Sequence, residues 1–363
     1  MPDHRIDTVT LRFRDASTFA HVVDPFAEDL SAAARAEDTL FLSCDETAGI
    51  DRLRADAPGL WGQHEHLSLG SHFDLPDGPE GEMDIEGLAA EDGWLWIVGS
   101  HALKRRRPKR EEKDAARSLG RMRRMTRDPN RYFLGRMPLA PAEHGGLMPV
   151  GAHRGRRAAS LRLRPNRAAL TDWLAKDPLL APFLAIPSKE NGLDIEGLAA
   201  RGDTVWLGLR GPVLRGHAVI LRLALRQRGK LLRARKIEED RRYALHLVPS
   251  AGLGIRDLAR DGDDLILLTG PVLGSDGPSH ILRWCGGARS KLPSGEGVVA
   301  SDEVEELLEL PYLGPRDHPE GITRWPEAGD DAWLVVCDSP AEARLDPARL
   351  SVKADIVALP PRR

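Results

Sequence analysis

The stretch DIEGLAAEDGWLWIVGSH, residues 84–101, decides the fold, because it returns as DIEGLAARGDTVWLGLRGPV at residues 194–213. Seven consecutive letters are identical, and each copy then passes through a short polar turn into an apolar segment that contains tryptophan. Two strand-like segments joined by a Gly/Asp turn predict a β-hairpin. A hairpin that recurs at long spacing is typical of a repeat architecture.

Three weaker copies extend the pattern. They are GIRDLARDGDDLILLTGPV at 254–272, HPEGITRWPEAGDDAWLVVCDSP at 318–340 and DLSAAARAEDTLFLSCDE at 29–46. The position of the motif glutamate is then taken by Ser31, Glu86, Glu196, Asp257 and Glu320, at separations of 55, 110, 61 and 63 residues. Since 110 is twice 55, we expect a further unit between residues 100 and 194. The alternative is one unit fewer, with a large insertion in that stretch.

Each unit contains more than a hairpin. Further strand-like segments follow, such as HAVILRLAL (217–225), HILRW (280–284) and RYFLGRMPL (131–139). Four antiparallel strands per unit are the content of one propeller blade. We therefore predict an all-β fold, a single β-propeller domain over residues 1–363, with six blades favoured and five as the alternative. The segments TVTLRF (8–13) and DIVAL (355–359) are expected to pair and close the ring.

Two stretches do not fit the repeat. Residues 102–130 form a basic insertion, and its later part has helix-forming residues. Residues 151–180 form a second insertion or a degenerate blade, with a helical pattern over 167–177.

Composition narrows the class of protein. Cys44, Cys285 and Cys337 are odd in number and widely spaced, which predicts neither a disulfide framework nor a zinc site. The polar N-terminus has no signal-peptide pattern and no apolar run is long enough for a membrane span, so we expect a cytoplasmic protein that does not enter the membrane.

Hairpin geometry predicts where the polar residues meet. The first strand of each blade lines the central channel, and its start lies beside the end of the second strand. The predicted functional residues therefore share one channel mouth. They are Glu86, Glu196, Asp257 and Glu320 as metal ligands, Arg210, Asp45 and Asp338 as substrate-binding residues, and His101 and His318 as proton-transfer residues.

Grouped carboxylates repel one another unless a cation, Arg210 or bound protons compensate their charge. Oxygen ligands favour Ca²⁺ or Mg²⁺, and a histidine ligand would shift the preference toward Mn²⁺ or Zn²⁺. A structural role is the alternative: the acidic side chains accept backbone hydrogen bonds, and glycine permits close packing of the blades. The repeat itself does not distinguish a cation site from this structural role.

The basic insertion follows a second strand, so it is expected over the same face. It is either a solvated flap or a cover that captures an anionic substrate. Clustered basic residues also suggest nucleic acid, but aromatic stacking partners are nearly absent there, which disfavours it. No nucleophile elbow, P-loop or zinc-protease motif is present.

The segments DIEGLA, LWIVGSHALKRRRPKR, RYFLGRMPL and HPEGIT together resemble the bacterial family known as domain of unknown function 3616. That resemblance implies a propeller with no assigned reaction. The Glu-Gly-Leu entries are also similar to those of phytase-like and esterase-like propellers, and of gluconolactonase-type propellers, in which a channel-mouth glutamate binds a metal. This sequence lacks a clear Asn/Asp set matching the gluconolactonase pattern, so that resemblance carries over no metal ligand. The expected function is cation-dependent hydrolysis of an anionic ester of phosphate or carboxylate. A non-catalytic propeller that binds a ligand or a protein partner is the alternative.

Overall fold

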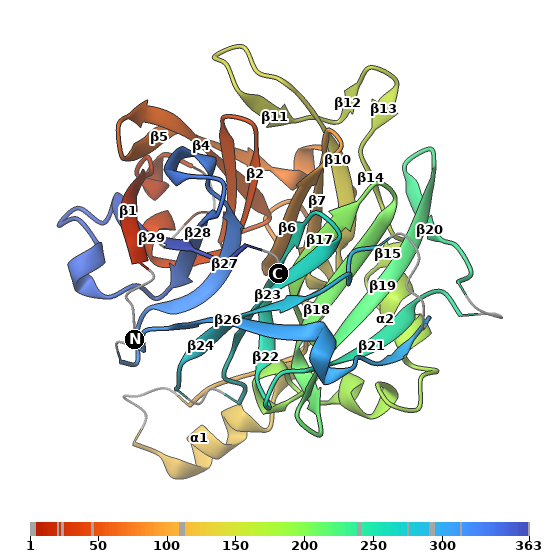
Figure 1. The fold of residues 1–363 in the computed structure, drawn as a ribbon. Helices are drawn as coiled ribbons and strands as arrows, with labels where there is room; N and C mark the ends of the chain where they lie inside the picture. The colour runs from red at the N-terminus through yellow and green to blue at the C-terminus, as the bar shows by residue number, and fades with distance from the viewer. Residues whose placement is uncertain are drawn as a thin grey trace.

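A computed structural model describes the whole chain except residues 1–4, 20–21, 23–24, 45–46, 109–112, 238–240, 274–275, 290–294, 313 and 362–363. The fold is almost entirely β, with antiparallel sheets arranged around a centre and few helices (Figure 1). Within the part of the chain that is described, no helix has the length and apolar character needed to span a bilayer.

The strands group into blades, each beginning with a repeat hairpin. The first holds β2 (Leu30–Ala36), β3 (Thr39–Cys44), β4 (Gly49–Ala57) and β5 (Leu60–Ser68). The second holds β6 (Ile85–Glu91), β7 (Trp94–Gly99), β10 (Leu134–Pro141) and the short β14 (Ala159–Ser160), with β11 (Leu147–Pro149) on β10. The third holds β17 (Asp194–Arg201), β18 (Thr204–Leu214), β19 (His217–Arg228) and β21 (Ala244–Pro249), with β20 (Leu231–Ala234) on β19 and β25 (Gly297–Val298) on β21.

The remaining two blades complete the set. The fourth holds β22 (Gly254–Asp261), β23 (Asp264–Gly270), β24 (Ser279–Trp284) and β26 (Val304–Leu310). The fifth holds β27 (His318–Arg324), β28 (Ala332–Asp338), β29 (Ser351–Ala358) and β1 (Arg5–Arg12).

The first strands of these blades form a closed ring. β2 lies against β6, β6 against β17, β17 against β22, β22 against β27, and β27 against β2. Among the described residues this gives five blades, and the favoured count of six is not confirmed. The described residues between 100 and 194 build no hairpin of the repeat kind. The strands β10 and β14 in this stretch extend the second blade, because β10 pairs with β7.

The rest of that stretch is made of short elements. The basic insertion contains β8 (Lys104–Arg105), α1 (Ala115–Met122) and β9 (Met125–Thr126), with β8 and β9 paired. The second contains the two-residue strands β12 (Ala152–His153), β13 (Arg156–Arg157), β15 (Leu163–Arg164) and β16 (Arg167–Ala168), followed by α2 (Ala169–Leu174). The helix α1 lies outside the ring of sheets at one end of the molecule (Figure 1).

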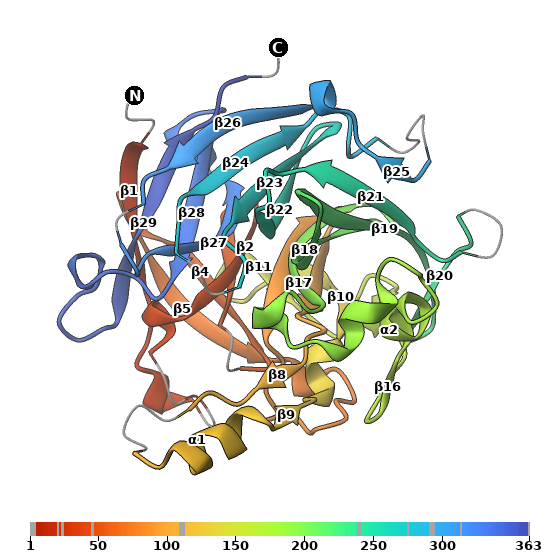
Figure 2. The same ribbon diagram turned by 90° about the horizontal axis from the view of Figure 1, so that it is seen from below.

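The N-terminal strand closes the ring, as predicted. β1 pairs antiparallel with β29, with Val9 opposite Ala354, and the two ribbons run side by side (Figure 2). β1 also pairs in parallel with β5, with Thr10 opposite Leu60. The last blade is thereby completed by the first residues of the chain, and its outer edge strand is paired with the first blade.

The repeat motif has a structural explanation. Every first strand carries a β-bulge at the motif, and the extra residues are Ser31, Glu86, Glu196, Arg256 and Glu320. A Cβ on the following glycine would meet the next blade. At Gly197 it would lie 3.0 Å from the backbone nitrogen of Leu258, and at Gly321 it would lie 2.9 Å from that of Ala33. The glycine is therefore required by the close approach of neighbouring blades.

Large apolar side chains fill the space between the sheets. Trp96, Trp206 and Trp333 are almost completely buried, which confirms that these second-strand tryptophans serve packing. Cys44 is buried in the core, whereas Cys285 and Cys337 are half-buried.

Candidate functional site

A pocket of about 800 Å³ lies at the channel mouth. It is bounded by the entries of the first strands on one side and by the basic insertion on the other. The acidic residues that line it include Glu82, Asp84, Glu86, Asp194, Glu196, Glu320 and Asp338, and the basic ones are Lys104, Arg105, Arg106, Arg107, Arg121, Arg131, Lys189 and Arg210. A second pocket of about 210 Å³ adjoins it and shares Arg107, Lys189, Arg210, Glu320 and Asp338.

Arginines of the third and fourth blades pair with the carboxylates at this pocket. Arg210, from β18, forms ion pairs with Asp194 and with Glu196, the latter at 2.7 Å. Arg256 forms ion pairs with Glu196 at 3.0 Å and with Glu320 of the fifth blade. The bulge residues of three consecutive blades are thus joined into a Glu–Arg–Glu row, which explains how carboxylates far apart in sequence become neighbours.

The second blade has an arginine of its own. Arg131 comes from the 3-10 helix Pro129–Tyr132, immediately after the basic insertion. It lies 2.5 Å from a carboxylate oxygen of Asp84 and also pairs with Glu82. The charge of Glu86 contributes to raising the pKa of both Arg131 and Arg210, after the larger contributions of their direct partners, so Glu86 belongs to the same network.

The floor of the pocket is defined here as Asp84, Glu86, Asp194, Glu196 and Glu320 with Arg131, Arg210 and Arg256. All five carboxylates are at least nine-tenths buried. Among the described residues the floor therefore places five carboxylates against three guanidinium groups. Burial raises the pKa of Asp194 to about 7, with Arg210 opposing and Glu196 and Asp84 adding to the shift. Burial also raises the pKa of Asp84, against the charge of Arg131.

The opposite wall of the pocket is basic. Lys104 pairs with Glu82 at 3.0 Å and Arg105 pairs with Glu190. Arg107 and Lys189 line both pockets, and neither has an ion-pair partner among the described residues. Burial in the pocket lowers the pKa of Lys189, and the charges of Arg210 and Arg107 lower it further. The predicted position of the basic insertion, over the carboxylate-bearing face, is confirmed by these contacts.

Most of the residues predicted from the sequence meet at this mouth. Glu86, Glu196, Glu320, Arg210 and Asp338 line the larger pocket. His318 lines the smaller one, with Nδ1 3.9 Å from a carboxylate oxygen of Asp338. Asp45 lies outside the described residues.

The prediction that Asp257 lies at the mouth is wrong. Asp257 occupies the glycine position of the motif, because the bulge of β22 falls at Arg256. Its carboxylate is fully buried and accepts hydrogen bonds from the backbone amides of Leu258 (2.7 Å) and Ile322 (2.8 Å). Burial raises its pKa well above the ordinary value. Asp257 therefore joins two blades, as the structural alternative predicted for such residues.

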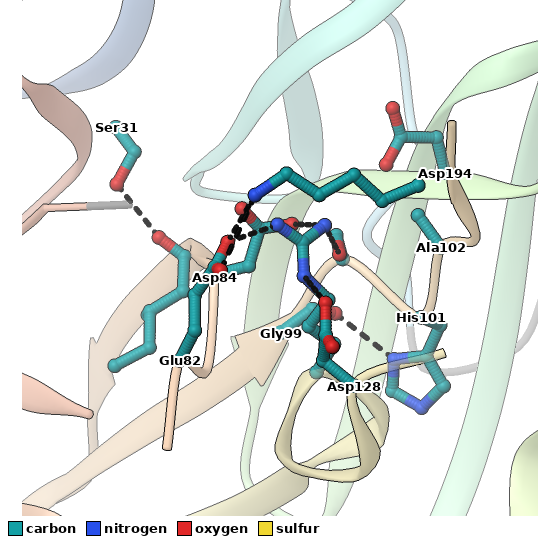
Figure 3. A network of polar contacts seen from close by, with 12 residues as sticks. Ser31, Glu82, Asp84, Gly99, His101, Ala102, Asp128 and Asp194 are labelled. Carbon is teal, nitrogen blue, oxygen red and sulfur yellow. Dashed lines mark hydrogen bonds and ion pairs between the residues drawn. The ribbon is translucent and has the colours of Figure 1, made fainter. Parts of the chain in front are cut away.

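His101 does not face the pocket either. Its ring is hydrogen-bonded through Nδ1 to the carbonyl oxygen of Gly99, at 2.9 Å, and lies apart from the carboxylate of Asp194 (Figure 3). The side chain is buried against Tyr132, and burial lowers its pKa to about 4. A neutral, enclosed imidazole without access to the pocket cannot transfer protons to a ligand there.

Three residues of the site escaped sequence analysis. Arg256 could have been found by aligning GIRDLA with DIEGLA letter by letter, since it stands in the glutamate position. Arg131 and Lys189 had no such signal. Arg131 follows the repeat strand β7 and Lys189 precedes the repeat strand β17, each in a segment outside the motif. Only the fold brings them to the mouth.

The geometry of possible metal ligands differs from the prediction. In the described part of the chain, one group of three residues has ligand atoms that all lie within 4.8 Å of one another, namely His280, Glu306 and Glu309. These residues belong to the outer strands β24 and β26, and they line neither mouth pocket. Metal binding at the mouth stays a prediction.

The family model described as "Protein of unknown function (DUF3616)" matches residues 29–355. The chain belongs to this family. No curated protein is significantly similar to the sequence of this DUF3616 protein.

Similar solved structures include an engineered GH43 glycoside hydrolase with endo-xylanase and exo-arabinofuranosidase activity (16% identity, TM-score 0.41). That match covers 91% of this chain but only 49% of the hydrolase. Glutaminyl cyclase from Myxococcus xanthus matches at 10% identity with a TM-score of 0.39, over 98% of both chains. The calcium-binding protein regucalcin from Agrobacterium tumefaciens matches at 12% identity with a TM-score of 0.35, again over 98% of both chains. These distant likenesses carry no functional argument for the DUF3616 protein.

Proposed function

We propose that the mouth pocket binds a small organic anion, an ester of phosphate or carboxylate, between the floor and the basic insertion. The observation that supports this most is the pair Arg107 and Lys189. Both line the pocket, and within the described residues neither forms an ion pair. Cations held near each other in a partly desolvated pocket repel, and an anionic ligand that bridges them removes the repulsion.

The charge distribution of the chain supports the same ligand class. Residues 104–127 contain twelve basic and three acidic side chains, whereas the whole chain has a net charge of −3. Basic side chains concentrated at one pocket raise the local concentration of anions there. A small anionic ligand fits a concave pocket of about 800 Å³, whereas a flat face would suit a protein partner better.

The proposed reaction is cation-dependent hydrolysis of the bound ester. What favours it is the floor, where five buried carboxylates outnumber three guanidinium groups. One Ca²⁺ or Mg²⁺ at Glu86 and Glu320 would offset that difference, activate a water molecule and polarise the ester. His318, beside Asp338, is then the group placed to transfer a proton. The alternative is a non-catalytic propeller that binds the same anion, or a protein partner, without turnover.

Isothermal titration with glycerol 3-phosphate tests the anion site. We expect Lys189→Met and Arg107→Met each to weaken binding about tenfold, which corresponds to roughly 1.4 kcal/mol. Lys353→Met, on the exposed side of β29, is the matched control and should bind like the wild type. Binding that is equal in all four proteins, or absent in all of them, would contradict the proposal.

Metal dependence is tested separately. We expect Ca²⁺, Mg²⁺ or Mn²⁺ to raise the melting temperature of the wild type but not that of Glu86→Gln. If no ion changes the melting temperature, the proposed hydrolysis is contradicted, but the proposed anion site is not.

A further inference from the structure

We propose that a second site, away from the channel mouth, binds a small molecule that carries a chain of phosphates. The site is a pocket of about 460 Å³ between the third blade and the second insertion, called here the outer pocket. It shares no lining residue with the two pockets of the mouth. Its walls come from β19 and β20 on one side and from β15, β16 and α2 on the other, and both ribbon views place α2 and β20 on the same side of the molecule (Figures 1 and 2). Among the described residues, six arginines line it: Arg162, Arg164, Arg167, Arg226, Arg233 and Arg242.

The strand register places two pairs of these arginines directly opposite each other. Arg226 of β19 faces Arg233 of β20. Arg164 of β15 faces Arg167 of β16. Residues at directly opposite positions of an antiparallel pair lie on the same face, with Cβ atoms about 4.5–5.5 Å apart, and like charges placed there destabilise the sheet. Two such conflicts at one pocket indicate a function, because natural sequences break a local rule mainly at functional sites.

Most of this positive charge is not compensated within the protein. Arg167 pairs with Asp172 at 3.0 Å, and Asp172 is the one acidic residue that lines the outer pocket in the described part of the chain. Arg164, Arg226 and Arg233 are exposed and form no ion pair with any residue that the structure describes. An anion with several charges close together removes the repulsion within both arginine pairs at once.

The chemistry of the arginine side chain favours phosphate as the charged group. The planar guanidinium group presents its N–H donors in a fork that matches two phosphate oxygens. A chain of phosphates concentrates several negative charges in a small volume and offers oxygens along its length. A single phosphate can bridge one arginine pair, whereas a chain can reach from the pair on β19 and β20 to the pair on β15 and β16.

The shape of the outer pocket favours a small molecule over a nucleic acid. Its volume lies within the range of small-molecule sites. Single-stranded nucleic acid is bound along an extended groove in which successive bases stack on aromatic side chains. Among the described residues that line the outer pocket, Trp173 is the one aromatic residue, half-buried, with the guanidinium carbon of Arg242 5.7 Å from its ring centre.

Titration calorimetry with inorganic tripolyphosphate, without divalent metal and at physiological ionic strength, tests the site. We expect Arg226→Gln and Arg233→Gln each to weaken binding about tenfold. Arg228→Gln is the matched control and should bind like the wild type, because it removes the same charge from an exposed position of β19 that does not line the outer pocket. Without ligand, Arg233→Gln should melt at or above the temperature of the wild type, since it removes one of two opposed charges. This melting temperature separates a loss of binding from a loss of folding.

Adenosine triphosphate distinguishes the two sources of a phosphate chain. If it binds more tightly than tripolyphosphate, and Trp173→Leu removes only that difference, the chain belongs to a nucleotide whose base lies on Trp173. Equal affinity of the two compounds assigns the site to a free oligophosphate. Either result supports the phosphate site.

Four results would overturn it. The first is no binding of tripolyphosphate, and the second is equal weakening in Arg228→Gln and Arg233→Gln, which shows only diffuse attraction of charge. The third is binding of orthophosphate or citrate as tight as that of tripolyphosphate, which removes the need for a chain of phosphates. The fourth is binding that is lost in Lys189→Met but kept in Arg233→Gln. That result assigns tripolyphosphate to the channel mouth and leaves the proposed function standing.

Discussion

Removing the guanidinium group of Arg256 is the sharpest perturbation of the ring. In Arg256→Met, Glu196 and Glu320 lose the cation that bridges them, and both carboxylates stay buried, at 2% and 6% exposure. Breaking a buried ion pair by removal of one partner costs about 3–5 kcal/mol. For a chain of 363 residues this corresponds to a fall in melting temperature of roughly 4–7 °C.

The assay is urea denaturation followed by tryptophan fluorescence, with Arg167→Met as the control. Arg167 pairs with Asp172 at 3.0 Å, but its side chain is 70% exposed, so its loss should cost less than about 1 kcal/mol. The double variant Arg256→Met/Glu320→Gln should recover part of the stability, because one uncompensated charge is gone. A loss below about 1 kcal/mol in Arg256→Met would refute the view that this arginine holds the neighbouring blades together.

Three further predictions concern the frame around the site. Gly197→Ala should destabilise the protein by about 1–3 kcal/mol, because the new Cβ meets the next blade, whereas Gly120→Ala in the exposed helix α1 should be neutral or stabilising in the same unfolding assay. His101 stays neutral in the folded state down to its pKa of about 4, so the wild type should lose up to about 3 kcal/mol of stability as the pH falls from about 6.5 to 4. The variant His101→Asn, in which asparagine tolerates the φ of 56°, should show a flatter dependence of stability on pH. Equal pH dependence in the two proteins would contradict the assignment. Deletion of residues 1–12 removes β1 from the fifth blade and should abolish cooperative unfolding, as judged by calorimetry.

The repeat in the sequence was sufficient to predict the all-β ring, the pairing of the chain ends and the face that carries the carboxylates. These features depend on local hairpin geometry and on periodicity, which a single sequence records. The blade count was less accessible. The separation of 110 residues is equally consistent with an extra blade and with a long insertion, and only the pairing of β10 with β7 distinguishes them.

The chemistry of the site was predictable in part. The sequence identified grouped carboxylates and the need for compensating charge, but the compensation comes from arginines of which only Arg210 was anticipated. Arg256 was missed because the fourth copy was aligned one residue out of register, which exchanged a bridging arginine for Asp257. A one-residue shift matters here because the bulge determines which side chain enters the mouth. Lys189 reaches the pocket through tertiary structure that no motif encodes.

The central claim is that the channel mouth binds a small organic anion beside Arg107 and Lys189. A crystal structure of the protein soaked with glycerol 3-phosphate tests it most directly. We expect phosphate oxygens within hydrogen-bond reach of Arg107 and Lys189. Phosphate bound away from the mouth, or Glu86, Glu196 and Glu320 found on separate surfaces, would contradict it.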